Sequence, residues 1–339
     1  METLLLNANN KGATDVAAEI LKKGGLVAIP TETVYGLAAN AFDENACSNI
    51  FKAKGRPGDN PLIVHICNMD MLGEVVKEIP EGAKKLAEKF WPGPLTIIMK
   101  KSEKVPAVTS ANLPTVAVRF PAHPVAREII EKSGLPLAAP SANLSGSPSP
   151  TTFEHCVHDL MGRVEGIIDG GACEVGVEST IVSLAGETPV LLRPGYVTLE
   201  QLRETLGEVE VSHAVLEKLE EGEKVLSPGM KYKHYAPKAK VILIKAKSED
   251  YIKYVNEHAG EDVYALCFDE EAEKLNVSTV KYGSEFSDEQ QAEHIFDALR
   301  IIDQSGAKLV YAHSPKATGV GLAVYNRLIR AAGFDIIEL

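Results

Sequence analysis

The chain has 339 residues, of which 45% are hydrophobic, and it carries a formal net charge of −12. A chain of this length is too long for one ordinary hydrophobic core and fits two domains, neither of which needs crosslinks to fold. The excess of 47 acidic over 35 basic residues disfavours broad electrostatic binding of nucleic acid, although it leaves room for a local basic pocket.

The five cysteines are scattered without a C-x-x-C pair, so neither a disulfide framework nor a zinc site with thiolate ligands is expected. The N-terminal stretch has no basic region, and no apolar run approaches the ~20 residues that span a bilayer. We therefore expect a cytoplasmic protein in a reducing compartment, with no contact to a membrane.

Helix and strand patterns alternate through the first two hundred residues, which predicts an α/β domain whose sheet is covered by helices. Residues 13–23 are predicted to form a helix, and residues 26–29 a short strand. Asp43 is expected to cap a helix that ends at Lys54. Further strands are predicted at residues 62–66, 95–99, 115–120, 137–139, 166–169, 180–184 and 190–192, and further helices near 80–90, 124–132 and 152–160.

A second, smaller α/β unit is predicted after one amphipathic helix and a charged connector. The segment 227–237 is unusual for a passive tether, because it places tyrosines, a histidine and lysines between prolines. Alternation then restarts, as in a Rossmann-like domain. Its strands are predicted at residues 241–244, 263–268, 309–312 and 334–337, and its helices near 248–258, 287–303 and 320–332.

Two cations, Lys54 and Arg56, stand where a predicted helix gives way to a loop of glycine and proline residues. An ammonium and a guanidinium can hold a polyphosphate from two directions, which favours a phosphate clamp. Cations at a helix C-terminus are also favoured by the helix dipole, with no ligand needed. On these residues alone, the two interpretations have equal weight.

Polar clusters follow three of the predicted strands. Thr31 belongs to the first, Ser141 and Asn143 to the second, and Arg193 to the third. Because ligands of open α/β sheets bind outside the carboxyl ends of strands, convergence of these clusters predicts a binding cleft. Each cluster is also compatible with a turn whose polar groups bond the local backbone, or, for Arg193, with an exposed turn cation.

Arg119 and His65 lie in predicted strands that should be at least half buried. A buried arginine needs a partner, which is either a structural carboxylate, the slightly favoured interpretation, or a ligand. His65 is more often a satisfied core histidine, and the hydroxyl of Ser179 is equally structural or ligand-facing. The chain lacks the G-x-x-x-x-G-K-[ST], G-x-G-x-x-G, G-x-S-x-G and H-E-x-x-H motifs, so side chains and irregular loops would have to hold a nucleotide.

Seven short motifs follow one another in the first two hundred residues: Pro-Thr-Glu-Thr-Val-Tyr-Gly-Leu at 30–37, Lys-Gly-Arg-Pro at 54–57, Asn-Pro-Leu at 60–62, Trp-Pro-Gly-Pro-Leu-Thr at 91–96, Val-Arg-Phe-Pro at 118–121, Pro-Ser-Ala-Asn at 140–143 and Gly-Val-Glu-Ser-Thr-Ile at 176–181. Together they resemble the YrdC-like family of threonylcarbamoyl-AMP synthases, and the rest of the chain looks like the long, two-domain form. The resemblance implies a catalytic domain with a twisted, open mixed sheet over residues 1–205, a linker over 206–239 that covers the active site, and a smaller Rossmann-like domain over 240–339.

The family makes L-threonylcarbamoyladenylate from L-threonine, bicarbonate or CO2, and ATP, and releases pyrophosphate. Other proteins then transfer the threonylcarbamoyl group to an adenosine of tRNA. The resemblance implies Mg2+ that enters with ATP and no metal bound by protein side chains. It implies three sets of site residues: Lys54, Arg56, Ser141 and Asn143 for catalysis; Thr31, His65, Arg119, Ala139 and Ser179 for L-threonine; and Lys54, Arg56, Thr115, Ser141, Ser149, Arg193 and Tyr232 for ATP.

Two other functions are weighed against this one. Related domains have a positive concave face that suits double-stranded RNA, so an RNA-binding module without catalysis is the main alternative. The net charge of −12 disfavours it, while leaving room for a weak contact with tRNA. A carbamoyl-adenylate domain of a hydrogenase-maturation protein would also carry zinc-binding C-x-x-C pairs, which this chain lacks.

Overall fold

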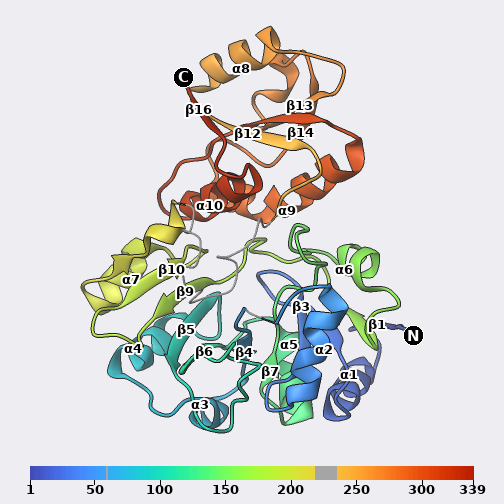
Figure 1. Ribbon diagram of the computed structural model, residues 1–339, viewed down its shortest axis with the longest axis vertical. Helices are drawn as coiled ribbons and strands as arrows, with labels where there is room; N and C mark the ends of the chain where they lie inside the picture. The colour runs from blue at the N-terminus through green and yellow to red at the C-terminus, as the bar shows by residue number, and fades with distance from the viewer. Residues whose placement is uncertain (59, 218–234) are drawn as a thin grey trace.

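The computed structural model describes residues 1–58, 60–217 and 235–339, which form two units around two separate sheets (Figure 1). Among these residues, none of the helices has the length and apolarity that a membrane span requires. The first unit contains β1 (Leu4–Asn7), α1 (Ala13–Lys22), β2 (Val27–Ile29), β3 (Gly36–Asn40), α2 (Glu44–Lys54), β4 (Ile63–His65), α3 (Met69–Val75), α4 (Glu81–Phe90), β5 (Leu95–Lys100), β6 (Thr115–Arg119), α5 (Pro124–Ser133), β7 (Leu137–Ala138), α6 (Phe153–Leu160), β8 (Gly166–Asp169), β9 (Thr180–Ser183), β10 (Val190–Arg193), α7 (Leu199–Leu206) and β11 (Glu210–Val211).

The sheet of the first unit is open and mixed, as the family resemblance implied. Its strand order is β1-β8-β2-β3-β7-β4-β6-β5-β9-β10-β11. Pairs such as β4 with β6 are parallel, whereas β5 with β6 and β9 with β10 are antiparallel. Strands that are distant in sequence therefore become neighbours, and their ends meet near the middle of the sheet.

Both faces of this sheet are covered near β2 and β3. Val27 and Ile29 pack into the cluster that includes α1 and α5, while Ala28 between them packs into the main core with α2. Successive side chains of a strand point to opposite faces, so this alternation places one layer of helices on each side of the sheet.

The second unit contains β12 (Lys240–Lys245), α8 (Ser248–Glu257), β13 (Val263–Cys267), β14 (Ser278–Lys281), α9 (Asp288–Ser305), β15 (Leu309–His313), α10 (Gly321–Ala331) and β16 (Ile336–Glu338). The sheet order is β14-β13-β15-β12-β16, and every pair is parallel. Helix α8 lies on the side away from the first unit, whereas α9 and α10 lie on the near side (Figure 1). This arrangement is the Rossmann-like α/β unit that the sequence predicts.

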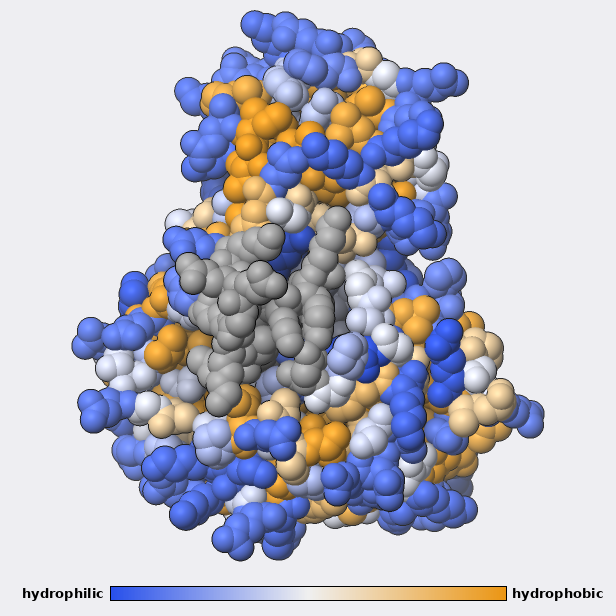
Figure 2. Space-filling model, in the orientation of Figure 1, coloured by the Kyte–Doolittle hydropathy of each residue, from blue (hydrophilic) through white to orange (hydrophobic). Residues whose placement is uncertain are grey.

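The two units share a hydrophobic core. Val34, Val175 and Val177 of the first unit belong to the same buried cluster as side chains of α9 and α10. The approach is close at Gly176, where an added Cβ would lie 2.3 Å from the Cα of Glu293 in α9. On the face shown in Figure 2, hydrophilic residues cover most of the outer rim of both units, and hydrophobic residues gather around β12.

The helices and strands predicted from the sequence are confirmed, with boundaries within two residues of those observed. The strands β1, β3, β11 and β14 and the helix α3 were not predicted from the sequence. The strand β3 has the sequence Gly-Leu-Ala-Ala-Asn, which lacks the β-branched and aromatic residues that mark a strand. It forms because β2 and β7 pair with it on either side, which is a tertiary effect.

Asp43 caps α2 as predicted, and the cap gives a test of local stability. Its Oδ1 accepts hydrogen bonds from the backbone N–H groups of Asn45 at 2.9 Å and Ala46 at 3.1 Å. We expect Asp43→Ala to lower the free energy of unfolding by about 1 kcal/mol, as loss of an N-cap usually does. Urea unfolding measures this. Asp70→Ala, an exposed change in the first turn of α3, is the control and should have a smaller effect.

Candidate active site

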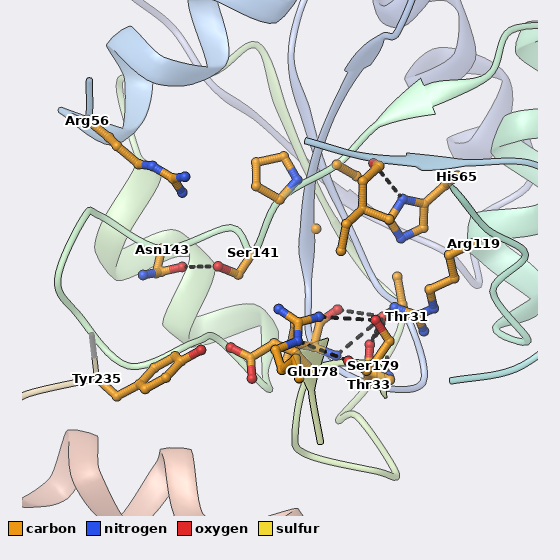
Figure 3. A pocket seen from close by; sticks show the side chains of 16 residues that line it. Thr31, Thr33, Arg56, His65, Arg119, Ser141, Asn143, Glu178, Ser179 and Tyr235 are labelled. Atoms are coloured by element: carbon orange, nitrogen blue, oxygen red, sulfur yellow. Dashed lines mark hydrogen bonds between the residues drawn. The ribbon is translucent and has the colours of Figure 1, made fainter. Parts of the chain in front are cut away.

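A narrow cavity lies where the polar clusters of the sequence analysis meet (Figure 3). Its walls come from the segments after β2 and β7, from the ends of β4, β6 and β10, and from the loop after α2. The sequence-predicted residues that line it are Thr31, Arg56, His65, Arg119, Ala139, Ser141, Asn143, Ser179 and Arg193. The predicted convergence of strand ends is therefore observed.

Strand geometry turns His65 and Arg119 toward the cavity. The preceding residues, Val64 and Val118, belong to the main core, so the next side chain along each strand must face the other way. His65 pairs with Arg119 in the register of the parallel strands β4 and β6. The two side chains therefore stand side by side at the carboxyl ends of their strands.

Arg119 has the carboxylate partner that the sequence analysis considered. Its Nη2 lies 2.7 Å from Oε1 of Glu32, and both side chains are buried. Its Nη1 donates to Oγ1 of Thr33 at 2.7 Å. Burial alone would raise the pKa of Glu32, but the Arg119 guanidinium holds that pKa below its ordinary value. Arg119 thus carries a structural ion pair and lines the cavity at the same time.

His65 is buried and is also part of the cavity wall. Burial, together with the charge of Arg119, lowers the pKa of His65 to about 3, so the ring is neutral. Its Nδ1 lies 3.2 Å from the carbonyl oxygen of Ile63, and a carbonyl can only accept. Nδ1 therefore carries the proton, which leaves Nε2 with a lone pair.

A β-bulge in β10 directs Arg193 toward the cavity. The pairing of β10 with β9 shifts register between Leu191 and Arg193, and such a bulge re-aims the side chain that follows it. Arg193 donates from Nε to the carbonyl oxygen of Ser179 at 3.0 Å and from Nη2 to its Oγ at 3.1 Å. Ser179 Oγ also bonds Thr96 at 2.7 Å. The turn interpretation of Arg193 as an exposed cation is wrong, because the side chain is buried.

Lys54 lies behind the Ser141–Asn143 segment. Its Nζ donates to the carbonyl oxygens of Ser141 and Asn143, and to the Asn143 side chain at 3.3 Å. Ser141 Oγ donates to Oδ1 of Asn143 at 2.6 Å. Burial, with a further contribution from Arg56, lowers the pKa of Lys54 to about 7. Lys54 therefore shapes the wall on which Ser141 and Asn143 stand, and Arg56 extends over that wall from the loop after α2 (Figure 3).

Glu178 is a buried carboxylate in the cavity wall. Its Oε1 accepts from Ser149 Oγ at 2.6 Å, and its Oε2 lies 3.0 Å from Nε of Arg327. Although burial would raise it, Arg327 and Arg193 lower the pKa of Glu178 to about 2. Ser149 is thus joined to the wall through Glu178, next to Arg193.

Two other residues, Thr115 and Tyr232, were predicted from the sequence to contact ATP. Thr115 begins β6, at the opposite end of that strand from Arg119, and Tyr232 lies outside the described residues.

Seven residues of the cavity wall were not among the site residues predicted from the sequence, and three of them have polar side chains: Thr33, Glu178 and Tyr235. Tyr235 is buried, with a φ of 63°, and burial together with Glu178 raises its pKa to about 12. The signal for Tyr235 was its place among the tyrosines of segment 227–237. Glu178 stood beside Ser179 in the Gly-Val-Glu-Ser-Thr-Ile motif, but its partner is more than a hundred residues away in the chain.

The fold and the site define an α/β protein whose narrow cavity is lined by three arginines, Arg56, Arg119 and Arg193. The family profile described as "Telomere recombination", which covers the Sua5, YciO and YrdC proteins, matches residues 19–195. The profile described as "Threonylcarbamoyl-AMP synthase, C-terminal domain" matches residues 197–333. The chain belongs to the Sua5/YciO/YrdC family, in its two-domain form.

Curated relatives cover nearly the whole chain. A threonylcarbamoyl-AMP synthase of Pyrococcus abyssi is 46% identical over 96% of this chain and 95% of its own length. One of Bacillus subtilis is 47% identical over 95% and 93%. The crystal structure of P. abyssi Sua5 complexed with L-threonine is 44% identical, has a TM-score of 0.91, and is matched over 99% of this chain and 100% of that one.

Glu178 gives a test of the site's electrostatics through stability. Its pKa in the folded protein is about 2, against an ordinary 4.5, so the carboxylate stabilises the fold above pH 4.5 and loses this effect as the pH falls toward 2. Linkage gives about 3 kcal/mol at neutral pH, of which about 2 kcal/mol is lost by pH 3. The difference in unfolding free energy between wild type and Glu178→Gln should therefore shrink by that amount between pH 7 and pH 3.

Urea unfolding at both pH values measures this difference. Glu187→Gln, a change in the exposed β9–β10 connection, is the control and should show a difference that hardly depends on pH. An equal pH dependence in the two variants would contradict the low pKa of Glu178.

Proposed function

We propose that the protein is a threonylcarbamoyl-AMP synthase, a nucleotidyltransferase that makes L-threonylcarbamoyladenylate from L-threonine, bicarbonate or CO2, and ATP, and releases pyrophosphate. The proposal rests on the arrangement of the site residues, which form two groups at opposite ends of one cavity (Figure 3). His65, Arg119, Thr31 and Ser179 lie at one end, whereas Arg56, Ser141 and Asn143 lie at the other. Full-length relatives named for this activity support it.

The end with His65 and Arg119 suits L-threonine. A guanidinium grips a carboxylate well, and Arg119 is held in place by Glu32 and Thr33. The lone pair of His65 Nε2 is suited to accept a hydrogen bond from the threonine hydroxyl. The hydroxyls of Thr31 and Ser179, with the Ala139 backbone, complete this end of the cavity.

The end with Arg56 suits the phosphates of ATP. Arg56 and Arg193 supply guanidinium groups, and Lys54 holds the Ser141–Asn143 wall from behind. The carbamate formed from the threonine amine and CO2 attacks the α-phosphorus, and pyrophosphate leaves. This reaction needs no protein nucleophile, so positioning and charge neutralisation account for catalysis. Ser149, Thr115 and Tyr232 remain proposed ATP contacts.

Mg2+ is proposed to enter with ATP. The carboxylate in the cavity wall, Glu178, already bonds Ser149 and Arg327, so the phosphate oxygens are the better ligands for this hard cation. The ion would add positive charge where the leaving pyrophosphate gathers negative charge.

The product is a mixed anhydride and is prone to hydrolysis. We propose that the protein works in the cytoplasm beside proteins that transfer the threonylcarbamoyl group to tRNA, as the first step of the t6A modification. The segment 206–239 would cover the site, and contact with tRNA itself would be weak. The position of Tyr235 in the cavity wall supports this proposal.

The activity is tested by giving the purified protein ATP, L-threonine and bicarbonate, and measuring pyrophosphate and the adenylate by mass spectrometry. We expect both products to require threonine.

Arg56→Ala should lower kcat/KM for ATP by about 100-fold, as loss of a phosphate clamp does, with an unchanged melting temperature. Lys52→Ala, an exposed cation on the last turn of the same helix, is the control. Absence of an adenylate, combined with tight, salt-dependent tRNA binding, would favour the RNA-binding alternative.

The lowered pKa of Lys54 predicts that ATP binding is coupled to proton uptake. With a pKa of about 7, Lys54 is mostly neutral at pH 8, and a nearby triphosphate favours its charged form. Binding of a non-hydrolysable ATP analogue at pH 8 should therefore take up protons. Calorimetry in buffers of different ionisation enthalpy measures the uptake, which Lys54→Met should abolish and Lys52→Met should not.

A further inference from the structure

Two arginines of the second unit reach into the first. Arg300 of α9 and Arg327 of α10 are both buried, and Arg327 is 0% exposed. The helices that carry them, α9 and α10, lie on the side of the second sheet that faces the first unit (Figure 1). The partners of Arg327 belong to segments that line the candidate active site, and those of Arg300 hold the loop that follows Asn143.

Arg300 holds the segment between Asn143 and Ser149. Its Nη1 and Nη2 bond the two carboxylate oxygens of Asp159 at 3.1 and 2.8 Å, and Nη2 also donates to the carbonyl oxygen of Pro148 at 2.7 Å. Asp159 in turn accepts from the backbone N–H of Leu144 at 3.3 Å. One guanidinium therefore ties down both ends of the loop that follows Asn143.

Arg327 joins the two segments that carry Ser179 and Arg193. It pairs with the Glu178 carboxylate at 3.0 Å and donates to the Glu178 carbonyl oxygen at 3.3 Å. It also donates to the carbonyl oxygen of Pro194, directly after Arg193. The site residues on both segments are thus positioned by a side chain from the other unit.

The charges at this contact also affect the electrostatics of the cavity. Glu178 stands between two guanidinium groups, Arg193 and Arg327, and both lower its pKa. Two cations and one carboxylate leave a net positive charge at the cavity. Without Arg327, the buried carboxylate would have Arg193 as its main counterion, and the pair would be neutral toward an anionic substrate.

We propose that the second unit contributes to the active site through Arg327, which acts as a positioning residue. Arg327 neutralises the Glu178 carboxylate, so the positive charge of Arg193 stays available to the ATP phosphates. Arg300 positions the loop between Asn143 and Ser149 in the same way. This inference rests on the proposed function and assigns the C-terminal unit a role in it.

The test uses the full-length protein and compares Arg327→Met with wild type. We expect KM for ATP to rise roughly 10- to 100-fold, because a buried charge pair is broken and a phosphate cation is neutralised. The affinity for a non-hydrolysable ATP analogue, measured by calorimetry, should fall by the same factor. Asp297→Ala is the matched control. It removes another contact between the units, Asp297 with His155 at 3.2 Å, which does not reach the cavity.

A second variant separates charge from mere structural support. In the double variant Arg327→Met/Glu178→Gln, the unpaired carboxylate is gone, so Arg193 regains its free charge. ATP affinity should recover to within roughly threefold of wild type if charge dominates. A double variant as weak as Arg327→Met, or weaker, would overturn the electrostatic role. If Arg327→Met fails to fold, Arg327→Lys keeps the charge but loses the fork. An ATP affinity within roughly threefold of wild type would then support the electrostatic role, and a loss as large as that expected for Arg327→Met would overturn it.

The result also separates this inference from the proposed function. A wild-type protein that makes no adenylate would contradict the function itself. A wild-type protein that is active, together with an Arg327→Met variant of unchanged ATP affinity, would overturn only the role of the second unit.

Discussion

The buried carboxylate of Glu178 is the point at which the two units and the site depend on one another. It accepts a hydrogen bond from Ser149, pairs with Arg327 of α10 and lies beside Arg193. An ionised group so deeply buried is stable only while its counterions stay in place. The docking of the second unit, the shape of the cavity wall and its positive charge are therefore linked through one side chain.

The remainder of the site follows from the geometry of strands. The core requires Val64 and Val118 to point inward, so the next residues, His65 and Arg119, must face the cavity. The bulge in β10 adds Arg193. The mixed strand order then brings the ends of β4, β6 and β10 together with the segments after β2 and β7. A rigid sheet thus holds groups that the loops alone would not keep in register.

The sequence was a good guide wherever a local signal existed. The capped helix ending at Lys54 and the polar clusters after the strands are all observed. The sequence was ambiguous where one side chain has both a structural partner and a place in the cavity wall. Arg119 was weighed as either structural or ligand-facing, and it pairs with Glu32 while it lines the cavity. The sequence did not indicate Glu178 as a site residue, because its partner Arg327 is far away in the chain and no nearby residue points to it.

By itself, the sequence determined the order of helices and strands, the cation pair at Lys54 and Arg56, and the motifs that identify the family, because these depend on residues close together in the chain. Only the tertiary structure decided that Lys54 holds the Ser141–Asn143 segment from behind, and that Tyr235 and Glu178 belong to the cavity wall. It also decided that two arginines of the C-terminal unit hold the loops of the site. Such contacts join residues up to about 150 positions apart, and no local pattern encodes a partner at that separation.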